Sequence, residues 1–149
     1  VYSNASQVQM FLPAIVFLIG CLLAFATGTS WGTFGMLIPI VQSVFPMDNP
    51  LSVVCISACM AGAVCGDHCS PISDTTIMAG AQCDHVNHVS TQLPYAITVA
   101  AVSFVSYVIA GFLPKAWIAL PIAIVLMLLT LFGIHMVHKR NKTVVSSSK

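Results

Sequence analysis

Residues 66–76 read Gly66-Asp67-His68-Cys69-Ser70-Pro71-Ile72-Ser73-Asp74-Thr75-Thr76 and form a polar stretch in an otherwise apolar chain. The stretch contains two of the chain's four acidic residues, together with four hydroxyl side chains, a histidine and a proline. An ionisable side chain is costly within a membrane segment and usually marks a functional site there. Asp67 and Asp74 are therefore the first candidates for such a site.

The composition of the chain indicates a membrane protein. Hydrophobic residues make up 58% of the 149 residues and charged residues 6%, whereas a soluble domain carries about 25% charged residues. Because a helix needs roughly 20 apolar residues to cross a bilayer, this length allows about four crossings or partial crossings. The net charge of +1 argues against nucleic acid as a partner. The expected surroundings are the lipid bilayer.

Outward from the polar stretch, four hydrophobic segments are predicted, two of them interrupted. An apolar helix over 10–26 is followed by a polar break over 27–33 and a half-helix over 34–45. A second apolar run over 51–64 leads into the polar stretch, after which a short tail follows. Two interrupted segments are the best sequence pointer to the binding site of a transporter. We therefore predict an all-α integral membrane fold with two broken or re-entrant helices.

The rest of the chain supplies connections and two uninterrupted crossings. Residues 46–50 form a turn in which Asp48 is expected to be solvated or to cap the next helix. Residues 82–92 are predicted to be a surface connection, and residues 93–112 and 118–137 to be full crossings. The basic tail over 139–149 is placed in the cytoplasm by the positive-inside rule. The chain starts without Met or a basic signal region, so we expect residues 1–138 to be the C-terminal part of a longer transporter domain.

The polar stretch suits the binding of a small cation or a proton. A carboxylate binds Na⁺ or H⁺ but not easily both, which is the competition that an antiporter needs. Hydroxyl oxygens are ligands that hard cations accept, and a histidine changes its charge near neutral pH. The candidate cation and proton site comprises Asp67, Asp74, Ser70, Ser73, Thr75, Thr76, His68 and, from the first break, Thr29 and Ser30.

Plainer interpretations of the same residues stay open. The hydroxyl groups would also serve to cap broken helix ends or to bond back to their own helix. Both aspartates would also fit as caps in a water-exposed loop, and His68 as a hydrogen-bonded partner of Asp67. A transition-metal site is a further alternative, since the region contains soft and borderline ligands. Their spacing matches no zinc module with four tetrahedral ligands. Those ligands are Cys65, His68, Cys69, Cys83, His85 and His88.

The run from Gly66 to Ile77 resembles the signature of the NhaC-type Na⁺/H⁺ antiporter family, which includes sodium-coupled malate/lactate antiporters. Residues 83–89 and 91–96 resemble the segment that follows it in that family, and residues 26–35 an upstream counterpart. The resemblance implies a secondary transporter of the cell membrane that uses no ATP and no cofactor. It also implies membership of the wider ion-transporter superfamily, whose folds contain re-entrant hairpins and broken helices.

Taken together, these expectations describe a Na⁺/H⁺ antiporter and not an enzyme. The alternative is an antiporter that couples sodium and protons to a small carboxylate such as malate or lactate. Neither break contains Lys or Arg, so this chain offers no strong anchor for such an anion. A membrane hydrolase with Asp67 and Asp74 as acid and base, and a non-transporting scaffold, are the alternatives from other classes. The rest of the same transporter is the expected partner, and the sequence leaves a homodimer open.

Overall fold

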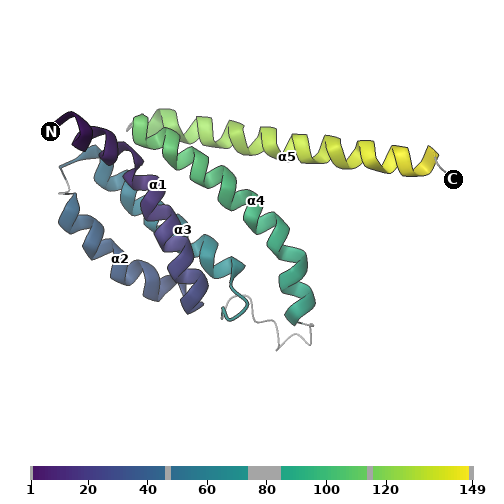
Figure 1. The fold of residues 1–149 in the computed structure, drawn as a ribbon, viewed down its shortest axis with the longest axis horizontal. Coiled ribbons are helices and arrows are strands. Elements are labelled where there is room, and N and C mark those ends of the chain that lie inside the picture. Colours follow the sequence, from purple (N-terminus) through teal and green to yellow (C-terminus); the bar gives the residue numbers. More distant parts are fainter. Residues whose placement is uncertain (1, 46–47, 74–84, 114–115, 148–149) are drawn as a thin grey trace.

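The computed structural model describes residues 2–45, 48–73, 85–113 and 116–147 of the chain. These residues form five helices (Figure 1): α1 (Tyr2–Thr27), α2 (Ser30–Val44), α3 (Pro50–Cys69), α4 (His85–Phe112) and α5 (Ala116–Ser147). Four stretches are long and apolar enough to cross a membrane: Gln9–Thr27, Pro50–Cys69, Asn87–Phe112 and Trp117–Met136. The predicted all-α class is confirmed, and the chain is part of a multi-pass membrane protein.

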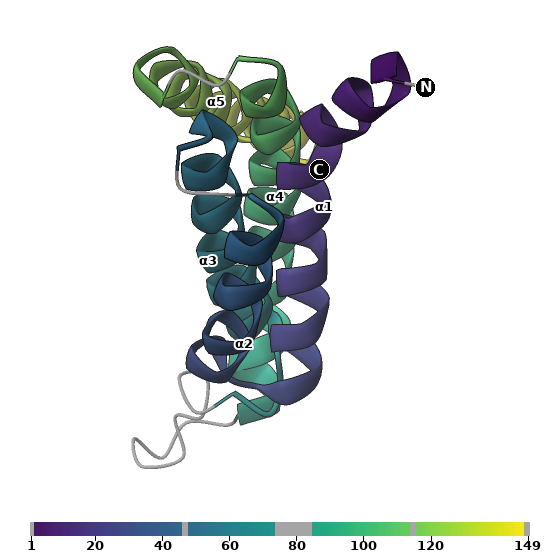
Figure 2. The same ribbon diagram turned by 90° about the vertical axis from the view of Figure 1, so that its left-hand side faces the viewer.

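Helices α1 to α4 lie side by side in a bundle. Helix α5 begins where α4 ends and runs away from the bundle at an angle to it (Figures 1 and 2). Both views show that the α1–α2 link, the C-terminal end of α3 and the start of α4 lie at the same end of the bundle. Helix α2 returns along the bundle in the direction opposite to α1. The two polar breaks, far apart in the sequence, are thus brought to one end of the molecule.

The closest packing in the bundle is between α1 and α3, which run in the same direction. Gly62 and Gly66 are four residues apart on one face of α3. A side chain at Gly62 would collide with the carbonyl oxygen of Phe17, and one at Gly66 with that of Cys21. Small residues at this spacing let membrane helices approach backbone to backbone. Helices α1 and α3 are therefore in backbone contact at these two glycines.

Apolar side chains fill the space where α1, α2 and α3 meet. The buried cluster consists of Val16, Val41, Phe45, Cys55 and Cys59. Helix α5 contrasts with this region, because none of the residues in its apolar window is buried within the chain. The bundle of α1 to α3 is therefore the packed part that positions the two breaks.

Several predicted boundaries need correction. Residues 82–92 were predicted to be a surface connection, which was wrong for residues 85–92, since α4 begins at His85. Residues 82–84 lie outside the described residues. The second apolar run continues as helix through Cys69, so Asp67 and His68 lie in the last turn of α3. A polar side chain does not end a helix when tertiary packing favours its continuation. The half-helix predicted after the polar stretch lies outside the described residues.

Candidate ion-binding site

The link between α1 and α2 consists of Gly28 and Thr29. Gly28 has φ 67°, a left-handed conformation that glycine adopts without steric cost. Its N–H donates to the carbonyl oxygen of Ala24 at 2.8 Å. Thr29 is the N-cap of α2, and its hydroxyl accepts the N–H of Gly32 at 3.4 Å. The chain thereby reverses within two residues while both helix ends keep their hydrogen bonds.

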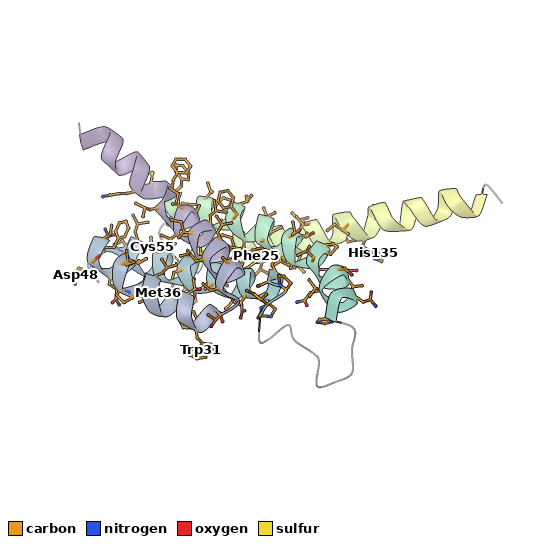
Figure 3. The ribbon with its side chains drawn as sticks, turned by 60° about the horizontal axis from the view of Figure 1, so that its bottom comes forward. Phe25, Trp31, Met36, Asp48, Cys55 and His135 are labelled. Carbon is orange, nitrogen blue, oxygen red and sulfur yellow. The ribbon has the colours of Figure 1, made fainter. Side chains whose placement is uncertain are left out.

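The hydroxyl groups around this link bond mainly to nearby backbone. Thr27 Oγ1 donates to the carbonyl oxygen of Leu23 at 2.9 Å, and Thr33 Oγ1 donates to that of Thr29 at 2.8 Å. The hydroxyl oxygens of Thr27 and Thr33 lie 3.3 Å apart. Ser30 and Thr33 are buried, whereas the neighbouring Trp31 points outward into the surroundings (Figure 3). The first break thus shows the capping and back-bonding pattern of the plainer interpretation.

The second break holds a buried carboxylate. Asp67 is 3% exposed in the last turn of α3, and the hydroxyl of Ser73 donates to its Oδ1. Ser70 caps α3 with an N–H that donates to the carbonyl oxygen of Asp67 at 3.0 Å. Its own hydroxyl accepts the N–H of Ile72 at 3.4 Å. Ser70 and Ser73 are fully buried, so residues 70–73 fold back over the carboxylate.

A direct contact joins the two breaks. Gly28 packs against the residue that precedes Ser73: a Cβ at Gly28 would lie 2.9 Å from both Cγ1 and the carbonyl oxygen of Ile72. The backbone of the first break therefore lies against the segment that covers Asp67.

The carboxylate at this end of the bundle favours a cation. Helices α1 and α3 end here and helices α2 and α4 begin here (Figure 1), so partial charges of both signs meet at this end. Asp67 adds a full negative charge, while residues 27–33 and 66–73 contain no Lys or Arg. Burying a carboxylate is unfavourable unless a proton, a cation or hydrogen-bond donors compensate it. The arrangement suits a small cation that competes with a proton.

The other predicted site residues are placed as follows. His68 is exposed, and its Nδ1 lies 3.0 Å from the carbonyl oxygen of Val64. It lines a largely apolar groove of about 880 Å³ between α3 and α4. Asp48 is exposed beyond the far end of α2 (Figure 3), and the cap of α3 is its neighbour Asn49. The predicted residues Asp74, Thr75, Thr76 and Cys83 lie outside the described residues.

Within the described part of the chain, no group of three or more His, Cys, Asp and Glu side chains could hold a metal ion. The five cysteines described there are free thiols. The contact between Gly28 and Ile72 was not predicted from the sequence. The glycine within the first break is the one feature of the sequence that could have indicated it. Thr33 is fully buried, but in the sequence it differs in no visible way from the other hydroxyl residues of that break.

Comparison with known proteins identifies the family. The model of the Na⁺/H⁺ antiporter family matches residues 2–112, which contain both breaks and helices α1 to α4. The chain belongs to the Na⁺/H⁺ antiporter family. Helix α5 and the basic tail lie beyond the matched residues.

Proteins similar to this chain are named for different functions. An uncharacterized protein of Haemophilus influenzae is 55% identical over 107 residues, covering 70% of this chain and 21% of that protein. The malate-2H⁺/Na⁺-lactate antiporter of Bacillus subtilis is 32% identical over 108 residues, covering 70% and 23%. The arginine/ornithine antiporter of Halobacterium salinarum is 30% identical over 116 residues, covering 72% and 23%. The chain thus spans about a fifth of the length of these relatives, and no solved structure matches it significantly.

Proposed function

We propose that this chain forms part of a secondary antiporter that exchanges Na⁺ for H⁺ across the cell membrane, with Asp67 as the group that binds both ions. The observation that carries the proposal is the burial of Asp67 at the end of a membrane-spanning helix, with a serine hydroxyl on its carboxylate. A side chain of this kind within a family of ion antiporters has a direct use as an ion-binding group.

The exchange follows from competition for one anionic group. When Asp67 is ionised, its negative charge attracts Na⁺ into the end of the bundle. A proton that arrives at the carboxylate removes this attraction and releases the ion. We propose that Ser70, Ser73, Asp74, Thr75 and Thr76 provide oxygens that replace part of the hydration of Na⁺.

The first break contributes support for the site through the contact of Gly28 with Ile72. Thr29 and Ser30 lie at the start of α2. We propose that His68, which follows Asp67 in the sequence, acts as a proton relay. In this proposal the basic tail over 139–149 faces the cytoplasm. The rest of the transporter completes the pathway.

A reconstituted flux assay tests this function. We would place the full-length protein in proteoliposomes with a trapped pH dye, impose a pH gradient and add NaCl. The proposal predicts that NaCl alone dissipates the gradient, that Asp67→Asn and Asp74→Asn abolish or strongly reduce this response, and that Asp48→Asn, at an exposed turn, does not. Undiminished exchange by both site variants would overturn the assignment to these carboxylates.

A second candidate is the exchange of a small organic acid coupled to Na⁺ and H⁺. The similarity to a malate-2H⁺/Na⁺-lactate antiporter favours it, and the N-terminus of α2 lies at the same end of the bundle as Asp67. The N-terminal end of a helix attracts carboxylates. In the same assay, a response that appears only with sodium malate or sodium lactate would select this candidate over simple Na⁺/H⁺ exchange.

A further inference from the structure

Three cysteines lie towards the ends of α1 and α3 that are near Asp67. Cys21 lies on α1 and Cys65 on α3, the two helices that pack most closely, and Cys69 follows Cys65 one helical turn later. All three are free and half-buried. Cys65 and Cys69 stand on either side of Asp67 in the sequence, so this thiol cluster is part of the end of the bundle where the two breaks meet.

The backbone contact between α1 and α3 fixes the spacing of the first two thiols. Gly66, which follows Cys65, packs directly against the carbonyl group of Cys21. No side chain separates the helices at this level, so Cys21 and Cys65 lie on adjoining turns of two helices in backbone contact. This pair is therefore built by the helix packing and not by a flexible loop.

One member of the pair can be reached from outside the bundle. Cys65 lines the groove of about 880 Å³ between α3 and α4. Cys55 and Cys59, on the same helix, are instead 0% exposed and belong to the apolar core. A small solute that enters the groove therefore meets Cys65.

We propose that Cys21 and Cys65 form a binding site for a soft thiophilic cation of the Cu⁺, Ag⁺ or Hg²⁺ type. Such cations prefer thiolate ligands and are satisfied by two sulfurs in line, so a third protein ligand is not required. With Hg²⁺, two S–H bonds break, two S–Hg bonds form and two protons leave to solvent. No oxidation or reduction takes place.

Occupation of this site ties α1 to α3 two residues before Asp67. The bridge fixes the distance between the two helices that end at the candidate ion site. The thiol pair therefore makes the transporter sensitive to soft metals, a property that goes beyond the exchange of Na⁺ and H⁺.

The test is thiol protection in the full-length protein, with HgCl₂ as the probe and N-ethylmaleimide as the label. After one equivalent of Hg²⁺, peptide mass spectrometry measures the labelling of each cysteine. The proposal predicts that Cys21 and Cys65 lose their labelling together and regain it after a dithiol chelator is added. Cys21→Ser should weaken the protection of Cys65 at least about tenfold in Hg²⁺ concentration, whereas Cys55→Ser, in the core of the same helix, should leave it unchanged.

The labelling pattern of the wild-type protein decides the proposal even if a variant fails to fold. Protection of Cys65 with Cys69 while Cys21 stays fully labelled would overturn it, as would protection of Cys65 that persists unchanged in Cys21→Ser. Because labelling needs no transport, this result stands apart from the outcome of the flux assay. Loss of exchange on addition of Hg²⁺, absent in Cys21→Ser, would support the proposed effect on the transporter.

Discussion

The two polar breaks meet at one end of the bundle but use their polar groups differently. Around the α1–α2 link, Thr27, Thr29 and Thr33 direct their hydroxyls at nearby backbone or at each other. At the end of α3, Ser73 directs its hydroxyl at the carboxylate of Asp67. The first break contains no charged residue and the second contains a buried one.

This difference assigns the two breaks different roles. The hydrogen bonds of the first break stabilise a reversal of the chain. The contact between Gly28 and Ile72 then holds the second break against this reversal. In the proposed mechanism, the second break provides Asp67, the group that binds Na⁺ or a proton. We therefore expect substitutions in the second break to affect ion exchange, and those in the first to affect mainly stability.

The largest difference is expected between Asp67→Asn and Thr33→Val, which alter one buried polar side chain in each break. A charge about 4 Å from an ion contributes about 4 kcal/mol at an effective dielectric constant near 20. Asp67→Asn should therefore lower the rate of Na⁺-driven proton movement by roughly 100- to 1,000-fold. Thr33→Val should lower it less than about tenfold. Equal losses in the proteoliposome assay would remove the distinction between the breaks.

Gly28→Ala is expected to have the next largest effect. A side chain in the left-handed conformation costs about 1–2 kcal/mol, and the added Cβ would lie 2.9 Å from the carbonyl oxygen of Ile72. We expect a clear fall in the melting temperature of the purified protein and a loss of most exchange activity. Gly35→Ala is the matched control, since a Cβ there meets nothing within 4 Å. A Gly28→Ala protein as stable and active as Gly35→Ala would show that the contact is unimportant.

Ser73→Ala removes the hydroxyl that bonds to Asp67 and leaves the carboxylate in place. A hydrogen bond contributes about 0.5–1.5 kcal/mol net, so we expect a Na⁺ concentration for half-maximal exchange that is roughly 2- to 10-fold higher. The control is Ser43→Ala on α2, whose exposed hydroxyl donates to the carbonyl oxygen of Ile40 at 2.7 Å. An unchanged Na⁺ dependence in Ser73→Ala would exclude this hydroxyl from the site.

The smallest effect on exchange is expected for Thr29→Ala. Loss of this N-cap should reduce the free energy of unfolding by about 1 kcal/mol, measured as a lower melting temperature. The Na⁺ dependence should change by less than about twofold. Thr29→Asn keeps a capping side chain and should restore stability. A strong fall in Na⁺ affinity that Thr29→Asn does not rescue would give Thr29 a direct role in ion binding.

The sequence predicted the helical class and the apolar segments because long uncharged runs leave few other folds in a membrane. It also located Asp67, since a carboxylate surrounded by apolar sequence is conspicuous. The helix over 85–92 was missed because its residues are polar, and polarity alone does not separate a loop from the end of a long helix. The contacts of Gly28 with Ile72 and of Cys21 with Gly66 depend on how α1 packs against α3, which no local pattern reports.

The family resemblance seen in the sequence is confirmed by the match over residues 2–112. The roles of Asp67 and the surrounding hydroxyls stay predictions. Ion selectivity depends on distances of a few tenths of an ångström between oxygens from several segments. A linear sequence does not contain those distances, and residues 74–76 lie outside the part of the chain that the structure describes.

The central claim is that Na⁺ and H⁺ compete for Asp67, and Na⁺ binding with simultaneous proton release tests it most directly. Isothermal titration of the full-length protein with NaCl, repeated in buffers of different ionisation enthalpy, gives the number of protons released per Na⁺ bound. At a pH where the site is protonated, the account predicts close to one proton released in the wild type and in Asp48→Asn. Asp67→Asn should show neither tight Na⁺ binding nor proton release. An Asp67→Asn protein that binds Na⁺ with the same affinity and releases the same number of protons would contradict the account.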